Sequence, residues 1–254
     1  MELTLGYEWL QAYLLVVIRV TLFIAIAPPF SNNSIPWRAK SILAAGLALA
    51  LAGRVEVPAG GLSAGDLVTA ATSEAATGAV LGILVMVAFA AIPAAGSLID
   101  LAGGFSMAAA YDPGSSVNGA QFTRLFQNGA YALMFASGAY IPVFLGLAKS
   151  LDVLALGQVP DMGNAAASAG MALAGMFAAA AQIAAPLIAV LFLADVGLGL
   201  LTKVAPTLNA FSLGFPLKIL ITLSFGGMIF MVLPLVVGQL TDAALKLMGQ
   251  VIGT

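Results

Sequence analysis

The sequence contains no cysteine and no histidine, and charged residues make up only 8% of its 254 positions. The first absence excludes disulfide bonds and thiol nucleophiles. The second removes the commonest metal-ligating side chain and the usual proton carrier near neutral pH. No spacing of the remaining Ser, Lys, Asp and Glu residues pairs a nucleophile with a base. We therefore predict no enzymatic activity, no catalytic or metal site and no bound cofactor.

Basic residues are also scarce, with nine Lys and Arg against eleven Asp and Glu and a net charge of −2. They form no patch that could follow a phosphate backbone, so we predict no nucleic-acid partner. They also favour no set of alternate loops, which prevents a choice of membrane orientation. The first eight residues carry two acids and no base, so we expect the first apolar segment to be retained rather than cleaved.

Apolar residues, in contrast, make up 61% of the chain. Ordinary soluble domains are about 25% charged, and a soluble fold of this size could not hide so much apolar surface. The apolar runs are long and do not alternate, which favours helices over a transmembrane barrel. The sequence therefore predicts an all-α integral membrane protein with several membrane helices.

The apolar segments of the first half differ in length, and a spanning helix needs about 20 residues. Residues 9–27 meet this length. Residues 41–52 are too few, so we expect a half-depth or re-entrant element. Residues 67–101 exceed a bilayer and include Pro93, where we expect a kink or two pieces.

In the second half we expect one helix over residues 122–147 and an ordinary aqueous loop over 148–164. Residues 165–201 and 217–240 form the last two apolar segments. The first of these is overlong for a bilayer. Either Pro186 breaks it, or it crosses obliquely or projects beyond the membrane.

A few charged and small residues interrupt the apolar segments. A charge at membrane depth is costly and usually faces protein or water. The spacing Gly78-x-x-x-Gly82 lets another backbone approach closely. Generic helix packing is the favoured explanation of the glycines alone, and Glu74 beside them favours a polar contact that faces protein. We predict subunit-packing or pore-facing roles for Arg19, Glu74, Gly78, Gly82, Asp100, Arg124, Asp195 and Lys203.

Two connections are unusually rich in bulky apolar residues. Residues 203–218 join the last two segments, and Pro206 and Pro216 are expected to bracket a break there. On residue types alone this is a tight turn with aromatic interface anchors. The predicted turn residues are Pro206, Asn209, Phe211, Gly214, Phe215, Pro216 and Lys218.

The second such connection spans residues 103–118. Irregular backbone at membrane depth is tolerated only where it is buried in protein or lines a cavity. A structured surface hairpin is the alternative. The residues of interest are Gly103, Gly104, Phe105, Met107, Tyr111, Asp112, Pro113 and Gly114.

The spaced pattern over residues 195–218 resembles the signature of the FliR family, components of the bacterial flagellar type III export gate. The pattern consists of Asp195, Gly199-Leu200, Lys203, Pro206, Asn209, Phe211, Gly214-Phe215-Pro216 and Lys218. Further similar positions are Arg19, Pro36, Arg38 and Lys40, the Glu74–Gly78–Gly82 series, and Asp112-Pro113-Gly114-Ser115 with Asn118 and Arg124.

The resemblance implies a FliP-like part over residues 1–164 and a FliQ-like helical hairpin over 165–254, with kinked and half-length helices built for a helical multi-subunit gate. It implies FliP and FliQ as partners, FlhB nearby, a basal body in the bacterial inner membrane, and unfolded flagellar proteins as transient cargo. It also implies that residues 103–118 plug the closed pore, with Phe105, Met107 and Tyr111 filling it and the glycines letting the loop move.

Two other functions stay open. The first is the equivalent subunit of an injectisome gate, the SctT-like branch, although the Gly214-Phe215-Pro216 and Asp112–Ser115 motifs look more flagellar. The second is a small-solute transporter, because broken helices and buried charges are compatible with a midplane site. The transporter hypothesis predicts saturable uptake by this chain alone, whereas the gate hypothesis predicts co-purification with larger partners.

Overall fold

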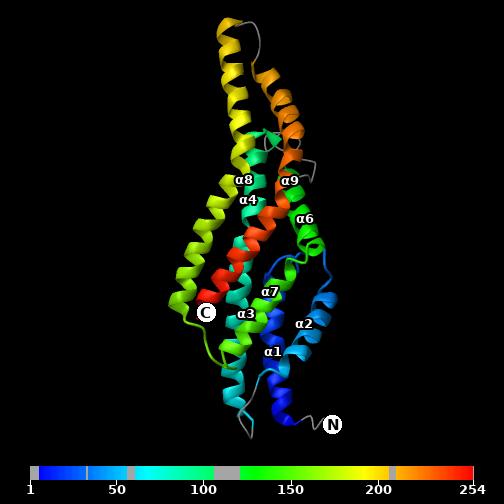
Figure 1. The fold of residues 1–254 in the computed structure, drawn as a ribbon, viewed down its shortest axis with the longest axis vertical. Coiled ribbons are helices and arrows are strands. Elements are labelled where there is room, and N and C mark those ends of the chain that lie inside the picture. Colours follow the sequence, from blue (N-terminus) through cyan, green and yellow to red (C-terminus); the bar gives the residue numbers. More distant parts are fainter. Residues whose placement is uncertain (1–5, 33, 56–60, 106–120, 206–209, 254) are drawn as a thin grey trace. The chain divides into compact units, whose positions relative to one another are not determined.

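The computed structural model describes residues 6–32, 34–55, 61–105, 121–205 and 210–253, with the side chains of 210–212 left aside. Regular structure in these ranges is α-helical (Figure 1), as the composition predicts. The helices are α1 (Tyr7–Ile26), α2 (Trp37–Ala52), α3 (Ala64–Phe89), α4 (Ala91–Ala102), α6 (Gln121–Ala136), α7 (Tyr140–Val153), α8 (Met162–Val204) and α9 (Ala210–Ile252).

Four helical stretches within the described residues are long and apolar enough to cross a membrane. They are Tyr7–Ile26, Ala64–Ala102, Met162–Val204 and Leu213–Ile252. The sharply bent pair α6 and α7 is a fifth candidate if it counts as one span. Length and composition therefore support a multi-pass membrane protein, and α2, with 16 residues, is shorter than a span.

The prolines differ in their effect on the helices. The expected interruption near Pro93 is confirmed, because α3 ends at Phe89 and α4 begins at Ala91. Pro93 has no N–H to donate to the Phe89 carbonyl four residues earlier, so the helical hydrogen bond at this point is missing. Pro186 lies inside α8, which is continuous, so of the alternatives for this overlong segment the break at Pro186 is not observed. Pro216 lies inside α9, so the prediction that it brackets a break is wrong. Each proline removes a single hydrogen bond, which long membrane helices tolerate.

The single helix expected over residues 122–147 is also wrong. It is two helices, because α6 ends at Ala136 and α7 begins at Tyr140. Gly138 between them has a φ of 74°, a left-handed conformation that glycine adopts without strain. Pro142 supplies no N–H to the Gly138 carbonyl, which favours the break at this point.

The chain divides into two compact units. The first comprises Met1–Phe89, Gly138–Leu173 and Gln239–Thr254, and the second comprises Ala90–Ser137 and Ala174–Gly238. Both α8 and α9 therefore contribute to each unit. The boundary at residue 164 between FliP-like and FliQ-like parts stays a prediction.

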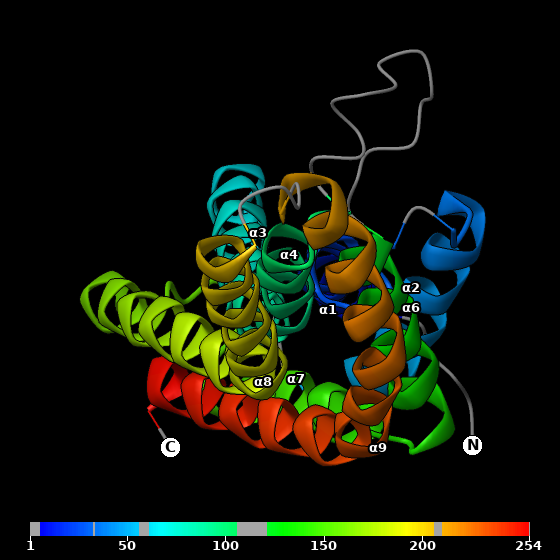
Figure 2. The same cartoon turned by 90° about the horizontal axis from the view of Figure 1, so that it is seen from above.

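In the first unit α1 is the central helix. It packs along α3 and α2, as both views show (Figures 1 and 2). Its side chains Val16, Val20 and Phe23 are fully buried. The Phe23 ring lies 6.4 Å from that of Phe144 on α7, centroid to centroid. This packing carries Arg19, in the middle of α1, into the core of the unit.

In the second unit α4 packs against α6. The contact is close because Gly96 has no side chain, and a Cβ there would lie 2.5 Å from Thr123 Cα. A row of three aromatic rings links α6 to α9. The ring centroids of Phe122 and Phe126 are 5.6 Å apart, and those of Phe126 and Phe230 are 5.4 Å apart. Edge-on contacts of this kind favour a single arrangement of the helices.

Candidate functional site

A buried ion pair between α1 and α3 is the most polar feature of the first unit. The Arg19 Nε donates to Glu74 Oε2 at 2.5 Å, and Nη2 donates to Glu74 Oε1 at 3.0 Å. Both side chains are 0% exposed. The two parallel bonds match the planar guanidinium to the carboxylate, the geometry in which such pairs are strongest.

The remaining hydrogen-bonding groups of this pair are satisfied by α7 and the connection that follows it. Arg19 Nη1 donates to the Ser150 carbonyl at 2.9 Å and to its Oγ at 3.2 Å, and Nη2 donates to the Leu154 carbonyl at 3.4 Å. The Gly157 N–H donates to Glu74 Oε1 at 2.9 Å. Hydrogen bonds that satisfy a buried charge pair in this way help to offset its desolvation penalty.

This network corrects the prediction that residues 148–164 form an ordinary aqueous loop. Residues 148–153 belong to α7, α8 begins at Met162, and Ser150 is fully buried. Sequence reasoning missed Ser150, Leu154 and Gly157. Two of the three act through backbone groups, which carry no side-chain signal, and serine is too common to stand out.

The two glycines on α3 bring α1 against it. A Cβ on Gly78 would collide with the Arg19 carbonyl oxygen, and one on Gly82 would lie 3.0 Å from Ile26 Cβ. The predicted close backbone approach at Gly78 and Gly82 therefore occurs inside this chain, between α3 and α1. Arg19 and Glu74 likewise have their partners inside the chain, and a role in contacts between subunits stays a prediction.

In the second unit Asp100 joins the end of α4 to the start of α6. Its carboxylate accepts hydrogen bonds from the Phe122 N–H at 2.9 Å, the Thr123 N–H at 3.0 Å and the Thr123 hydroxyl at 2.8 Å. The free N–H groups of a helix N-terminus favour such an anion. Asp100 is 3% exposed, so it is a buried cap of the N-terminus of α6. It ties this helix to the end of α4, and segment 103–120 lies between the two in the sequence.

The glycines that begin this segment face α9. A Cβ on Gly103 would lie 2.7 Å from Thr222 Oγ1, and one on Gly104 would lie 3.0 Å from the Phe215 ring. Gly104 also has a φ of 83°. Phe105 follows, with its ring 5.3 Å from that of Phe122. The other predicted residues of the segment, Met107, Tyr111, Asp112, Pro113 and Gly114, lie outside the described residues.

A second ion pair joins α8 and α9. Lys218 Nζ lies 2.7 Å from Asp195 Oδ1, and the two side chains are 22% and 49% exposed. The expectation that Asp195 meets a residue on another helix is confirmed. Lys203 lies in the last turn of α8, where a cation complements the helix dipole, and both Lys203 and Arg124 are exposed.

The predicted turn over residues 203–218 is shorter than expected. Because α9 begins at Ala210, Phe211, Gly214, Phe215, Pro216 and Lys218 lie in its first turns rather than in a turn between helices. Pro206 and Asn209 lie outside the described residues. From this position in α9, Lys218 reaches Asp195 on α8.

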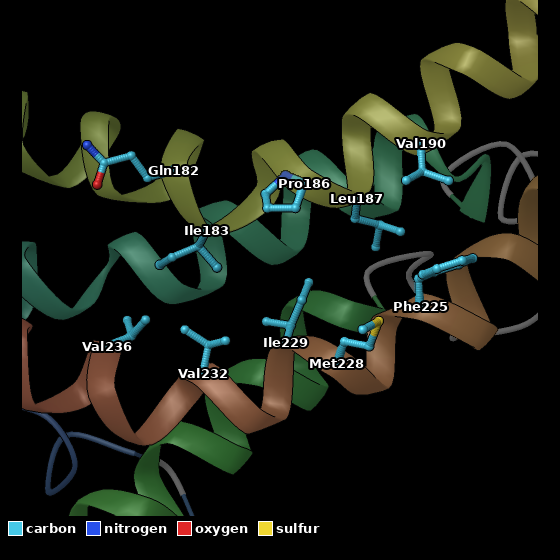
Figure 3. Close-up of a pocket in the computed structure, with 10 residues that line it drawn as sticks. All are labelled: Gln182, Ile183, Pro186, Leu187, Val190, Phe225, Met228, Ile229, Val232 and Val236. Atoms are coloured by element: carbon cyan, nitrogen blue, oxygen red, sulfur yellow. The ribbon is translucent and has the colours of Figure 1, made fainter.

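Between the parts of α8 and α9 that belong to the second unit lies an apolar cavity of about 390 Å³ (Figure 3). Side chains from both helices point into it, and Gln182 is its single amide. The lining residues are Gln182, Ile183, Pro186, Leu187, Val190, Phe225, Met228, Ile229, Val232 and Val236. Such a lining accommodates apolar groups and offers nothing that could carry out a reaction.

The sequence profile of one protein family, described as "Bacterial export proteins, family 1", matches residues 10–244. The chain is 31% identical over 220 residues to the flagellar biosynthetic protein FliR of Escherichia coli K12, which covers 85% of this chain and 83% of that protein. It is 30% identical over 214 residues to FliR of Bacillus subtilis 168, over 83% of each.

A second group of proteins is also similar to the chain. The surface presentation of antigens protein SpaR of Salmonella typhimurium is 31% identical over 150 residues, which is 57% of this chain and 54% of that protein. SpaR of Shigella flexneri is 24% identical over 231 residues, which is 88% of this chain and 88% of that protein. Both groups thus match the chain over most of its length, and over that length the two flagellar proteins match it at higher identity.

Proposed function

Because this chain belongs to the family of bacterial export proteins that includes FliR, we propose that it is a structural subunit of the flagellar type III export gate. In this role it forms part of the conduit through which unfolded flagellar proteins leave the cell, and the energy for export is supplied elsewhere. The family is one of transport proteins rather than enzymes. The proposed location is the inner membrane, within the flagellar basal body.

The observation that carries the flagellar choice is the identity of the matches that span most of the chain. FliR of E. coli is 31% identical over 85% of the chain, whereas SpaR of Shigella flexneri is 24% identical over 88%. SpaR of Salmonella typhimurium reaches 31% identity, but over 57% of the chain. The injectisome gate subunit is therefore the second candidate.

The surface of the second unit supports a role as one subunit among several. Within the candidate spans of α8 and α9, the 18-residue stretches that meet the length and hydropathy requirements have only 17% and 22% of their residues buried. Met231 is 83% exposed, and Phe192 and Leu193 are 64% and 67% exposed. Apolar surface of this extent calls for lipid or protein neighbours. We propose that FliP and FliQ supply the protein neighbours and that FlhB lies nearby.

The test is a deletion of the gene in the bacterium that carries it, followed by a swimming assay and purification of the tagged chain from membranes. We expect loss of motility, rescue by the wild-type gene, and co-purification of FliP- and FliQ-type proteins. As a control, injectisome secretion should be unaffected where that system is present. Normal swimming with lost effector secretion would overturn the flagellar role in favour of the injectisome, and saturable uptake of a small solute by the chain alone would favour a transporter.

The plug role of residues 103–118 is a finer part of the same proposal. The residues next to this segment support the plug role. Asp100 joins α4 to α6 across the segment, and Gly104 at its start adopts a left-handed conformation. Deletion of residues 106–118 should make cells leak ions and small solutes. An intact permeability barrier in cells that still assemble the gate would contradict the plug role.

A further inference from the structure

An open groove of about 310 Å³ runs across α7 and the last turns of α9, both within the first unit. The two helices touch beside Gly146, where a Cβ would lie 3.1 Å from both Leu245 Cδ2 and Met248 Cε. The walls are apolar with one exception, a lysine. The lining residues are Pro142, Leu145, Gly146, Lys149, Leu245, Met248, Gly249 and Ile252.

That lysine, Lys149, is exposed and keeps its charge available. Within the described part of the chain it makes no ion pair. The nearest acid along α7 is Asp152, one turn further on, which is already paired with Arg54 at 3.6 Å. Lys246 is the other lysine on this part of α9, but Asp242 stands four residues before it, a spacing that offsets its charge. The groove therefore has one apolar floor and one positive end.

Charged residues first appear on the surface of α7 at this lysine. On the N-terminal side, Ile141 and Leu145 are 49% and 62% exposed, although both are large and apolar. On the C-terminal side, Lys149 and Asp152 are exposed charges, and Val153 after them is 40% exposed. The change occurs within about 6 Å of helix, one turn. Such a boundary, with a lysine whose alkyl chain lies along apolar surface, is typical of the level of lipid headgroups.

We propose that this groove binds an anionic phospholipid, with the lipid phosphate on the Lys149 ammonium and an acyl chain along the floor beside Leu145 and Gly146. The charge and the apolar floor lie side by side, and an amphiphile with a negative head uses both. A free phosphate ion would leave the floor in water, and an apolar helix laid in the groove would cover the ammonium without a partner. The inference rests on the membrane location of the chain and not on its role in export.

The binding test uses the full-length chain in nanodiscs that contain equal amounts of dioleoyl phosphatidylglycerol and dioleoyl phosphatidylcholine. Lipids retained after release are counted by native mass spectrometry. We expect about a fivefold preference for the anionic lipid, the factor for one lysine at an anionic lipid surface. Lys149→Gln should abolish the preference, and Leu145→Asn should lower retention of both lipids. Added inorganic phosphate should displace neither.

Lys203→Gln is the matched control, because Lys203 is also an exposed lysine in the C-terminal part of a helix but lies outside the groove. It should keep the preference. All three substitutions are at exposed side chains, so circular dichroism should report unchanged helix content. Equal retention of the two lipids by the wild type, or a preference that survives Lys149→Gln, would overturn the proposal.

A second measurement separates lipid from protein as the occupant. The chain has no cysteine, so the Leu145→Cys variant carries a single thiol for a photo-crosslinking label. In native membranes the label should attach to phospholipid. Attachment to a protein instead would show that a neighbouring subunit covers the groove, and would overturn the lipid assignment while leaving the export role intact.

Discussion

The two ion pairs inside the apolar helices, one in each unit, are built in opposite ways. Arg19 and Glu74 have no exposed surface, and every buried polar side-chain atom in the described residues has a partner. Asp195 and Lys218 are at a similar distance from each other, but are 49% and 22% exposed. The buried pair therefore stabilises the fold itself. Removal of either member would leave the other as a buried charge without a partner, which is strongly destabilising. The half-exposed pair remains accessible to another molecule.

The buried pair gives the largest expected effect on stability. Glu74→Gln keeps the volume of the side chain but leaves the Arg19 charge uncompensated, which should cost about 3–5 kcal/mol. The midpoint of thermal unfolding of the purified protein in detergent measures this. The double variant Arg19→Met with Glu74→Gln removes the stranded charge and should recover part of the loss. A double variant no more stable than Glu74→Gln alone would mean that the charge is not the cause.

The second largest loss of stability is expected from a substitution that adds a methyl group between α3 and α1. Gly78→Ala would push against the Arg19 carbonyl, and such overpacking costs about 1–3 kcal/mol. The control is Gly170→Ala on α8, where a Cβ would meet nothing within 4 Å. That change should be neutral or stabilising by up to about 1 kcal/mol, because alanine favours helix. Equal effects of the two substitutions on the unfolding midpoint would contradict the close contact.

The cap on α6 comes third. Asp100→Ala removes three hydrogen bonds at a helix N-terminus and should cost about 1–2 kcal/mol. Hydrogen exchange should become faster in the first turn of α6 and stay unchanged in α1. Asp161→Ala is the comparison, since Asp161 accepts from the Gly163 and Asn164 N–H groups at the exposed start of α8. Asp161→Ala should lower the free energy of unfolding by less than Asp100→Ala, because its cap is exposed. A larger loss for Asp161→Ala would argue that burial does not strengthen the cap.

The smallest effect is expected from the half-exposed pair. Lys218→Met should change the stability of the isolated chain by about 0–1 kcal/mol, as for other solvent-accessible pairs. If this pair contacts a neighbouring subunit, the same variant should lower the amount of partner protein that co-purifies. A large loss of stability with unchanged co-purification would show that the pair acts internally, like Arg19 and Glu74.

Several features of the fold follow from the sequence alone. The scarcity of charge and the length of the apolar runs predicted membrane helices, and Pro93 predicted the interruption between α3 and α4. Pro216 was predicted to bracket a break and instead lies inside α9, because a long helix tolerates the loss of one hydrogen bond at a proline. The sequence left the effect of Pro186 open for the same reason. The break before α7 follows from Pro142 together with Gly138, and the left-handed conformation of Gly138 is not revealed by the sequence.

Of the residues in the candidate site, the sequence predicted only the two charged ones, Arg19 and Glu74. Arg19 and Glu74 stood out because a charge in an apolar segment needs a partner. That they are each other's partners depends on the packing of α1 on α3, which no local pattern specifies. The contributions of Leu154 and Gly157 come from backbone atoms, so residue types could not reveal them.

The use of those backbone atoms limits where the chain can accept extra residues. The connection between α7 and α8 looks like a spacer, yet its Leu154 carbonyl and Gly157 amide complete the shell around a charge pair that has no access to water. An epitope or fluorescent tag inserted at residues 154–157 would displace both groups together. Gln158 and Val159, directly after this stretch, are exposed, so a tag inserted there should be tolerated. Positions that tolerate an insertion and positions that do not are therefore neighbours in the sequence.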